Sequence, residues 1–271
     1  MSERSDGPPK KRVELTLTPI EMTYIARLIG ADTLFGIGDP FFGWLTEEIR
    51  EAWAKAHEDL KTRKVVENGP EGALRVDVIA GGALAVCSRP EARVVLQVKT
   101  RGAEEQTMVF HKTRRLCVGH ALATDPQKPI TLTLFDGPGD MVEEMFSIAG
   151  LSGGENARSV RWRSSMGALW AAVEAAEREP QILPAALARL CKGEEGRSEL
   201  EETFRTEFRF VSAVRVIEGE NAGPPRAAAF LGNGRYLWEI RPEFSGEDIA
   251  IDVSLTDPEG AKAAFLGMIG I

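Results

Sequence analysis

The spacing of hydrophobic residues changes from helical to alternating near residue 90. Before that point the apolar positions recur every three or four residues, as on one face of a helix. Thr18, Pro19 and Glu21 form the start signal of a first helix, because Thr18 can cap it and Glu21 stands where a capping box needs it. We predict that this helix runs to about Ile29 and shares a face of Ile20, Tyr24, Ile25 and Leu28.

Two more helices are predicted before the change of period. Thr46 is expected to cap the second, whose apolar stripe consists of Ile49, Trp53, Ala56 and Leu60. The third is predicted over Leu74–Cys87, ending before Pro90. The residues between the first two helices, 36–43, are expected to form a loop that carries Phe41 and Phe42.

After Pro90 the alternation predicts strands. The pattern indicates strands at 93–99, 108–111, 115–120 and 130–134, followed by a helix from Asp140 to about Ala149. A second series follows, with helices at 164–177, 183–191 and 198–206 and strands at 208–217, 227–231, 235–240 and 249–253. Gly232-Asn233-Gly234 predicts a tight hairpin, and Asp257-Pro258 opens a last helix.

The second series of elements follows the first at an offset of 120 residues. Residues 93–148 laid on residues 213–268 show the same order of strands, turn and helix. We therefore predict an α+β fold with two pseudo-symmetric repeats, each an antiparallel sheet with flanking helices. The repeats are expected at 13–150 and 151–271 in one joint globular body, with a linker near 150–155, after a disordered tail at 1–12.

Composition favours a cytoplasmic protein of 271 residues. The net charge of −8 disfavours nucleic acid, which is bound through clustered positive charge. Apolar stretches such as Val76–Cys87 are far short of the roughly 20 residues that span a membrane, and the first residues lack a signal peptide's apolar core. Three widely spaced cysteines fit a reducing compartment better than a set of disulfides.

The sequence predicts no catalytic, cofactor or metal site. His111, Cys117 and His120 lie close together, but Cys117 and His120 are three apart on a strand, so their side chains face opposite ways. There is no nucleophile motif, and the glycine-rich stretches lack the flanking elements of a phosphate loop. The protein is therefore not expected to be an enzyme.

Two other functional readings stay open. One is a small-ligand-binding protein or enzyme whose site lies between the two halves. The other is a winged-helix transcription regulator, suggested by the second and third helices and by Lys61, Arg63 and Lys64. Against the regulator, the helix predicted at Leu74–Cys87 is apolar on most sides, which is typical of a buried helix.

Three segments resemble the EspG family, chaperone-like proteins associated with type VII (ESX) secretion. They are LTPIEMTYIARLIG at 17–30, EEIREAWAKAHEDLKTRKVV at 47–66 with the SRPEARVVLQV strand at 88–98, and GRYLWEIRP at 234–242 with the ending at 249–269. The resemblance implies a quasi-two-fold α+β fold that binds helical, secreted proteins and keeps them soluble without catalysis. The family's partner-contacting residues do not map onto identifiable positions here.

One hypothesis is that a protein partner docks on loops held by the sheet, and the alternative is that these loops are ordinary connections. The candidate loops are the hairpin tips at 112–114 and 232–234 and the connections at 102–106 and 219–225. Phe41 and Phe42 become further candidates if they are exposed, because aromatic side chains are favoured at the centres of interfaces.

Overall fold

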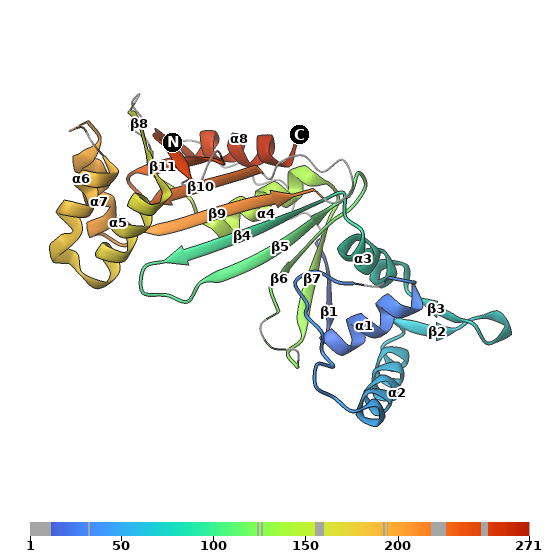
Figure 1. Ribbon diagram of the computed structural model, residues 1–271. Helices are drawn as coiled ribbons and strands as arrows, with labels where there is room; N and C mark the ends of the chain where they lie inside the picture. The colour runs from blue at the N-terminus through green and yellow to red at the C-terminus, as the bar shows by residue number, and fades with distance from the viewer. Residues whose placement is uncertain are drawn as a thin grey trace. The chain divides into compact units, whose positions relative to one another are not determined.

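The computed structural model describes most of the chain. The described residues are 12–31, 33–123, 125, 127–154, 160–191, 193, 195–217, 226–244 and 249–270. The tail predicted at 1–12, except Arg12, and the loop predicted at 219–225 lie outside them. Helices and antiparallel strands make an α+β fold, as predicted (Figure 1). The chain divides into two compact units, Met1–Glu91 with Val109–Met141, and Ala92–Met108 with Val142–Ile271.

The first unit combines three helices with strands from both of its segments. Its elements are β1 (Val13–Leu17), α1 (Pro19–Leu28), α2 (Thr46–Thr62), β2 (Val66–Asn68), a 3₁₀ turn (Pro70–Gly72), β3 (Leu74–Val76), α3 (Val78–Ser88), β6 (Cys117–Ala121) and β7 (Ile130–Phe135), with the 109–112 part of β5 (Gln106–Lys112). The strand order is β1-β7-β6-β5, and β2 pairs only with β3 among the described strands. Leu17, Met22, Ile25, Leu60 and Leu84 are among the residues that fill its core.

The capping box predicted at the start of α1 is present. Thr18 Oγ1 accepts a hydrogen bond from the Glu21 backbone at 3.2 Å, and the Glu21 carboxylate accepts one from the Thr18 backbone at 2.8 Å. The predicted apolar face is partly wrong. Met22, Ile25 and Ala26 are buried, whereas Leu28 is exposed, because the core lies on the Met22 side of the helix.

The third helix starts later than predicted. Leu74–Val76 is strand β3, paired with β2, so the predicted helix Leu74–Cys87 is wrong over its first turn. Asp77 caps α3 instead, since its carboxylate accepts hydrogen bonds from the backbones of Ile79 and Ala80 at 2.9 and 3.1 Å. The N-cap of α2 is Leu45 and not Thr46 as predicted. The Glu48 carboxylate accepts a hydrogen bond from the Leu45 backbone N–H at 2.7 Å.

The second unit has a longer run of strands. Its elements are β4 (Ala92–Thr100), the 142–149 part of α4 (Pro138–Ala149), β8 (Arg161–Ser165), α5 (Met166–Arg178), a 3₁₀ turn (Pro180–Ile182), α6 (Leu183–Leu190), α7 (Arg197–Arg205), β9 (Arg209–Val216), β10 (Arg226–Gly232), β11 (Leu237–Glu243), β12 (Ala250–Thr256) and α8 (Pro258–Ile269). The strand order is β4-β9-β10-β11-β12-β8, and each strand pairs antiparallel with its neighbour.

The helix predicted from Ser164 begins at Met166. Ser164 and its neighbours pair with β12 as strand β8, and Ser165 caps α5 by accepting from the Ala168 backbone at 3.2 Å. In the core of this unit Trp238 is fully buried, and its indole N–H donates to the Thr203 hydroxyl at 3.1 Å. A buried indole needs such an acceptor, so α7 and β11 are fixed to each other at this point.

Element boundaries repeat at the predicted offset. β10 starts at 226 and β5 at 106, and α8 starts at 258 and α4 at 138, so each pair differs by 120. The starts of β6 and β11, and of β7 and β12, differ by the same number. These four pairs agree with the predicted offset, whereas the starts of β4 and β9 differ by 117, so the two repeats and their division at 150/151 remain predictions.

Candidate protein-binding surface

The connection between α1 and α2 is braced by aromatic rings. Phe41 contacts Trp44 and Trp53 edge to face, with ring centroids 5.8 Å apart in each pair. The Arg27 guanidinium of α1 lies 4.5 Å from the centre of the Trp53 ring, within the range of a cation–π interaction. These contacts tie the loop to both helices, so the loop holds a defined conformation.

Two apolar side chains of the same connection have more than half of their surface in solvent. Phe42 is 88% exposed and Leu45 is 67% exposed, whereas Phe41 is partly buried within the brace. Phe42 therefore meets the condition set for a partner contact, and Phe41 supports it from behind. We call Phe42, Leu45 and the braced loop between them the aromatic platform.

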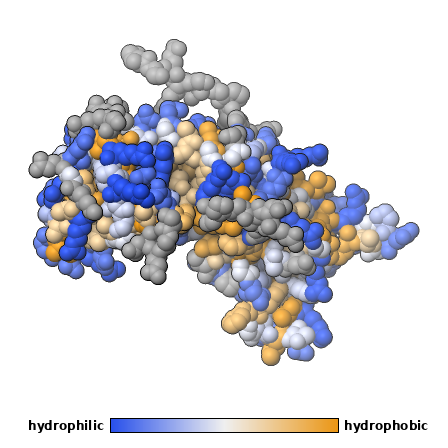
Figure 2. Space-filling model, turned by 45° about the horizontal axis from the view of Figure 1, so that its top comes forward, coloured by the Kyte–Doolittle hydropathy of each residue, from blue (hydrophilic) through white to orange (hydrophobic). Residues whose placement is uncertain are grey.

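An open pocket lies in the same unit. Its volume is 580 Å³, and its lining comes from α1, the connection and α2, with Ala26, Arg27, Leu34, Pro40 and Trp53 among the residues. Its wall mixes these apolar side chains with two threonines and with one charge of each sign, Arg27 and Asp39. Figure 2 shows apolar side chains at the surface, interspersed with hydrophilic ones.

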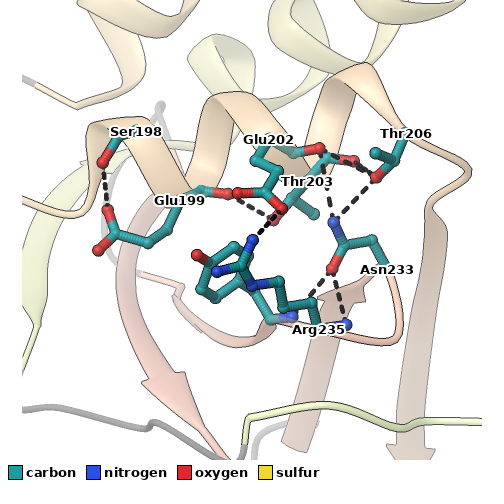
Figure 3. A network of polar contacts seen from close by, with 8 residues as sticks. Ser198, Glu199, Glu202, Thr203, Thr206, Asn233 and Arg235 are labelled. Carbon is teal, nitrogen blue, oxygen red and sulfur yellow. Dashed lines mark hydrogen bonds and ion pairs between the residues drawn. The ribbon is translucent and has the colours of Figure 1, made fainter.

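The candidate hairpin tip at 232–234 is bound to the fold by its own polar groups. Asn233 donates from its side-chain amide to the Thr206 hydroxyl at 2.9 Å and accepts from the backbones of Arg235 and Tyr236 at 3.1 and 2.9 Å (Figure 3). Arg235 also forms an ion pair with Glu202 of α7 at 2.7 Å. The tip is anchored because its polar groups are already used within the fold.

The other predicted loops are more open. At the first-unit tip Thr113 closes the turn by bonding to Leu116, and Arg114 extends into solvent 3.8 Å from Glu91. The connection at 102–106 is exposed throughout. Either could contact a partner, and their role stays a prediction.

Of the three residues weighed as a metal site in the sequence, His111, Cys117 and His120, the structure brings only the two histidines together. His111 and His120 meet, with their Nε2 atoms 3.0 Å apart, and the third member is Cys87 of α3 instead of Cys117. Burial lowers the pKa of His120. Burial raises the pKa of the Cys117 thiol from 9.0 to about 11, which favours its uncharged form. Sequence spacing missed Cys87 because it lies on a different element, more than twenty residues away.

The position of α3 does not support the winged-helix hypothesis. Ala80, Ala83 and Leu84 are fully buried in the core of the first unit. A recognition helix must present its side chains to a DNA groove, and these are packed against protein.

Among the comparisons with known proteins, only the comparison of folds gives a match on which a function can be proposed. No protein-family model matches the sequence, and no curated protein matches it. One similar solved structure is that of the Mycobacterium tuberculosis type VII secretion system chaperone EspG5 in complex with the PE25-PPE41 dimer. The match has a TM-score of 0.60 and 9% sequence identity, and covers 95% of this chain and 96% of the other.

The chain has the fold of EspG5. The resemblance to the EspG family inferred from the three sequence segments is thereby confirmed at the level of the fold. The EspG5-like architecture includes both compact units, since the match extends over nearly the whole chain. None of the helices in the described part of the chain has the length and apolarity needed to span a membrane.

Proposed function

We propose that this protein is a non-enzymatic, chaperone-like module that binds a protein partner. The observation that carries the proposal is the extent of the fold match, which spans 95% of this chain and 96% of a chaperone solved in complex with a protein dimer. Fold alone does not determine function, so the match needs support from a surface suited to binding. The aromatic platform supplies that support.

The partner we propose is a helical protein, as for the secreted substrates of type VII systems. A helix presents apolar side chains in a ridge, and Phe42 and Leu45 offer apolar area to receive it. The brace formed by Phe41, Trp44 and Trp53 holds the loop in place before binding. Less conformational entropy is then lost when the partner docks.

Co-purification from the source organism tests this function. The tagged chain is recovered at moderate salt, and its companions are identified by mass spectrometry and quantified. A helical protein in a fixed molar ratio, lost with Phe42→Ser and retained with the exposed control Phe244→Ser, supports the proposal. Recovery of the chain with a bound small molecule and no protein would favour the ligand-binding alternative.

A further inference from the structure

Three buried side chains with soft or borderline donor atoms converge in the first unit. Cys87 comes from the end of α3, and His111 and His120 from the neighbouring strands β5 and β6. All three residues are fully buried, and one donor atom of each lies within 4.8 Å of the others. Sulfur and imidazole nitrogen are the donors that zinc and copper prefer, and the group has no carboxylate for a hard cation.

The turn of the β5–β6 hairpin explains why the two histidines meet. The backbone N–H of Thr113 donates to the carbonyl oxygen of Leu116, so these two residues lie opposite each other at the turn. Counting two residues back along β5 and two residues on along β6 places His111 opposite Val118. His120 is two residues beyond Val118 and shares its face, so His111 and His120 are diagonal neighbours. Val118 packs in the same core as Cys87, which places this face of the hairpin toward α3.

His120 is held in the tautomer that a metal ligand requires. Its Nδ1 lies 2.8 Å from the carbonyl oxygen of Ala121, and a carbonyl can only accept, so Nδ1 carries the proton. In the neutral ring Nε2 then has a lone pair, which accepts from His111 Nε2–H at 3.0 Å in this structure and which would coordinate an ion in its place. A backbone carbonyl on the far nitrogen is the usual support of a metal-bound histidine.

Gly36 leaves room for the His120 ring. A Cβ atom at this position would lie 3.2 Å from His120 Cε1 and 3.1 Å from Val109, and the φ of +80° also favours glycine. The loop that contains Gly36 is tied to the strand end by the bond from Ala123 N to Gly36 O at 2.9 Å. The ring is therefore confined between this loop and the hairpin.

We propose that Cys87 Sγ, His111 Nε2 and His120 Nε2 bind a thiophilic d¹⁰ ion, Zn²⁺ or Cu⁺. Metal–nitrogen bonds of about 2.0–2.1 Å at a tetrahedral angle separate two nitrogens by roughly 3.3 Å. The two Nε2 atoms are now 3.0 Å apart. To bind an ion, the two rings must therefore move apart by a few tenths of an ångström and turn their lone pairs toward a common point. The Cys87 thiol releases its proton to solvent as the thiolate–metal bond forms, and His111 gives up the proton on its Nε2 and takes one on Nδ1, so that both Nε2 lone pairs face the ion.

Such an ion would join the end of α3 to the β5–β6 hairpin. Since it binds the folded arrangement and not the unfolded chain, it would stabilise the first unit in proportion to its free concentration. The proposal is independent of the partner-binding function, and either can fail without the other.

Metal titration of the full chain tests the site. The apo protein is prepared with a chelator under reducing conditions, then titrated separately with Zn²⁺ and with Cu⁺, and bound metal is measured by elemental mass spectrometry after dialysis. One equivalent of one of these ions is expected, with a Kd raised more than about 100-fold in Cys87→Ser and in His120→Gln. Cys117→Ser, a buried cysteine on the opposite face of β6, is the matched control and should bind as wild type.

Two results would overturn the site: no retained ion in the wild type in either titration, or retention unchanged in both ligand variants. X-ray absorption of the metal-loaded Cys117→Ser protein gives an answer even if the ligand variants do not fold. One sulfur and two imidazole neighbours around the ion support the site, and a shell without sulfur refutes it.

Discussion

Asn233 fixes the β10–β11 turn to α7 through Thr206, whose hydroxyl lies 2.9 Å from the Asn233 amide nitrogen. The same side chain caps the turn through its oxygen, which accepts from two backbone N–H groups. One residue thus closes the hairpin and attaches it to the helix. The strand pair behind it carries the buried Trp238, so the attachment bears on the core of the second unit.

Asn233→Ala should destabilise the protein by about 1–3 kcal/mol, because it removes both the turn acceptor and the donor to α7. Chemical denaturation followed by circular dichroism measures the change in free energy of unfolding. Replacing the exposed Gln106 with Ala is the control and should shift it by less than about 0.5 kcal/mol. Equal effects of the two substitutions would show that the anchoring contributes nothing.

Glu21→Gln should also destabilise the protein, by about 1–2 kcal/mol. Glu21 is buried and joins the α1 cap to Arg63 at 2.8 Å, so loss of its charge weakens both contacts. Arg63 is 42% exposed and remains hydrated, which keeps the loss below that of a fully buried pair. Thermal unfolding measures it, with the exposed Glu47→Gln as control. An unchanged midpoint for Glu21→Gln would contradict the predicted role.

Phe42→Ser should weaken partner binding without affecting the fold. The side chain is 88% exposed, so its removal costs the folded state less than about 0.5 kcal/mol. If it is a central contact, the Kd for the co-purified partner should rise at least about tenfold. Calorimetry on the isolated pair gives the Kd, with Phe244→Ser as the matched control. Identical affinities for both variants would move the interface away from the platform.

Stability should fall as the pH rises from 9 toward 11, in part through Cys117. Burial raises the pKa of its thiol from 9.0 to about 11, so over this range the folded chain keeps a proton that the unfolded chain has lost. The contribution of the Cys117 thiol to the free energy of unfolding is complete below pH 9 and is lost as the pH passes the pKa of about 11 in the folded chain. Urea unfolding at several pH values should show a shallower decline for Cys117→Ala than for Cys191→Ala. Parallel curves would exclude this linkage.

The sequence was sufficient where local signals agreed with tertiary packing. The Thr18–Glu21 cap, the Asn233 turn and the start of α8 at Asp257-Pro258 all occur as predicted, because each depends on residues close in the chain. The fold class followed from the order of such elements.

The failures come from contacts between distant residues. Leu74–Val76 is helical by composition, but its pairing with Val66–Asn68 makes it a strand. Ser164 likewise becomes part of β8 through β12, nearly ninety residues away. Cys87 joins the histidines only because α3 packs on the hairpin, which no spacing in the sequence indicates.

The aromatic brace has a practical consequence for detecting a partner. Trp44 and Trp53 flank Phe41, next to the exposed Phe42, whereas the other three tryptophans belong to the second unit. Indole emission depends on the polarity around the ring, so a protein seated on Phe42 would displace water beside these two fluorophores. The chain therefore carries its own optical reporter, which needs no dye and can follow an encounter in real time.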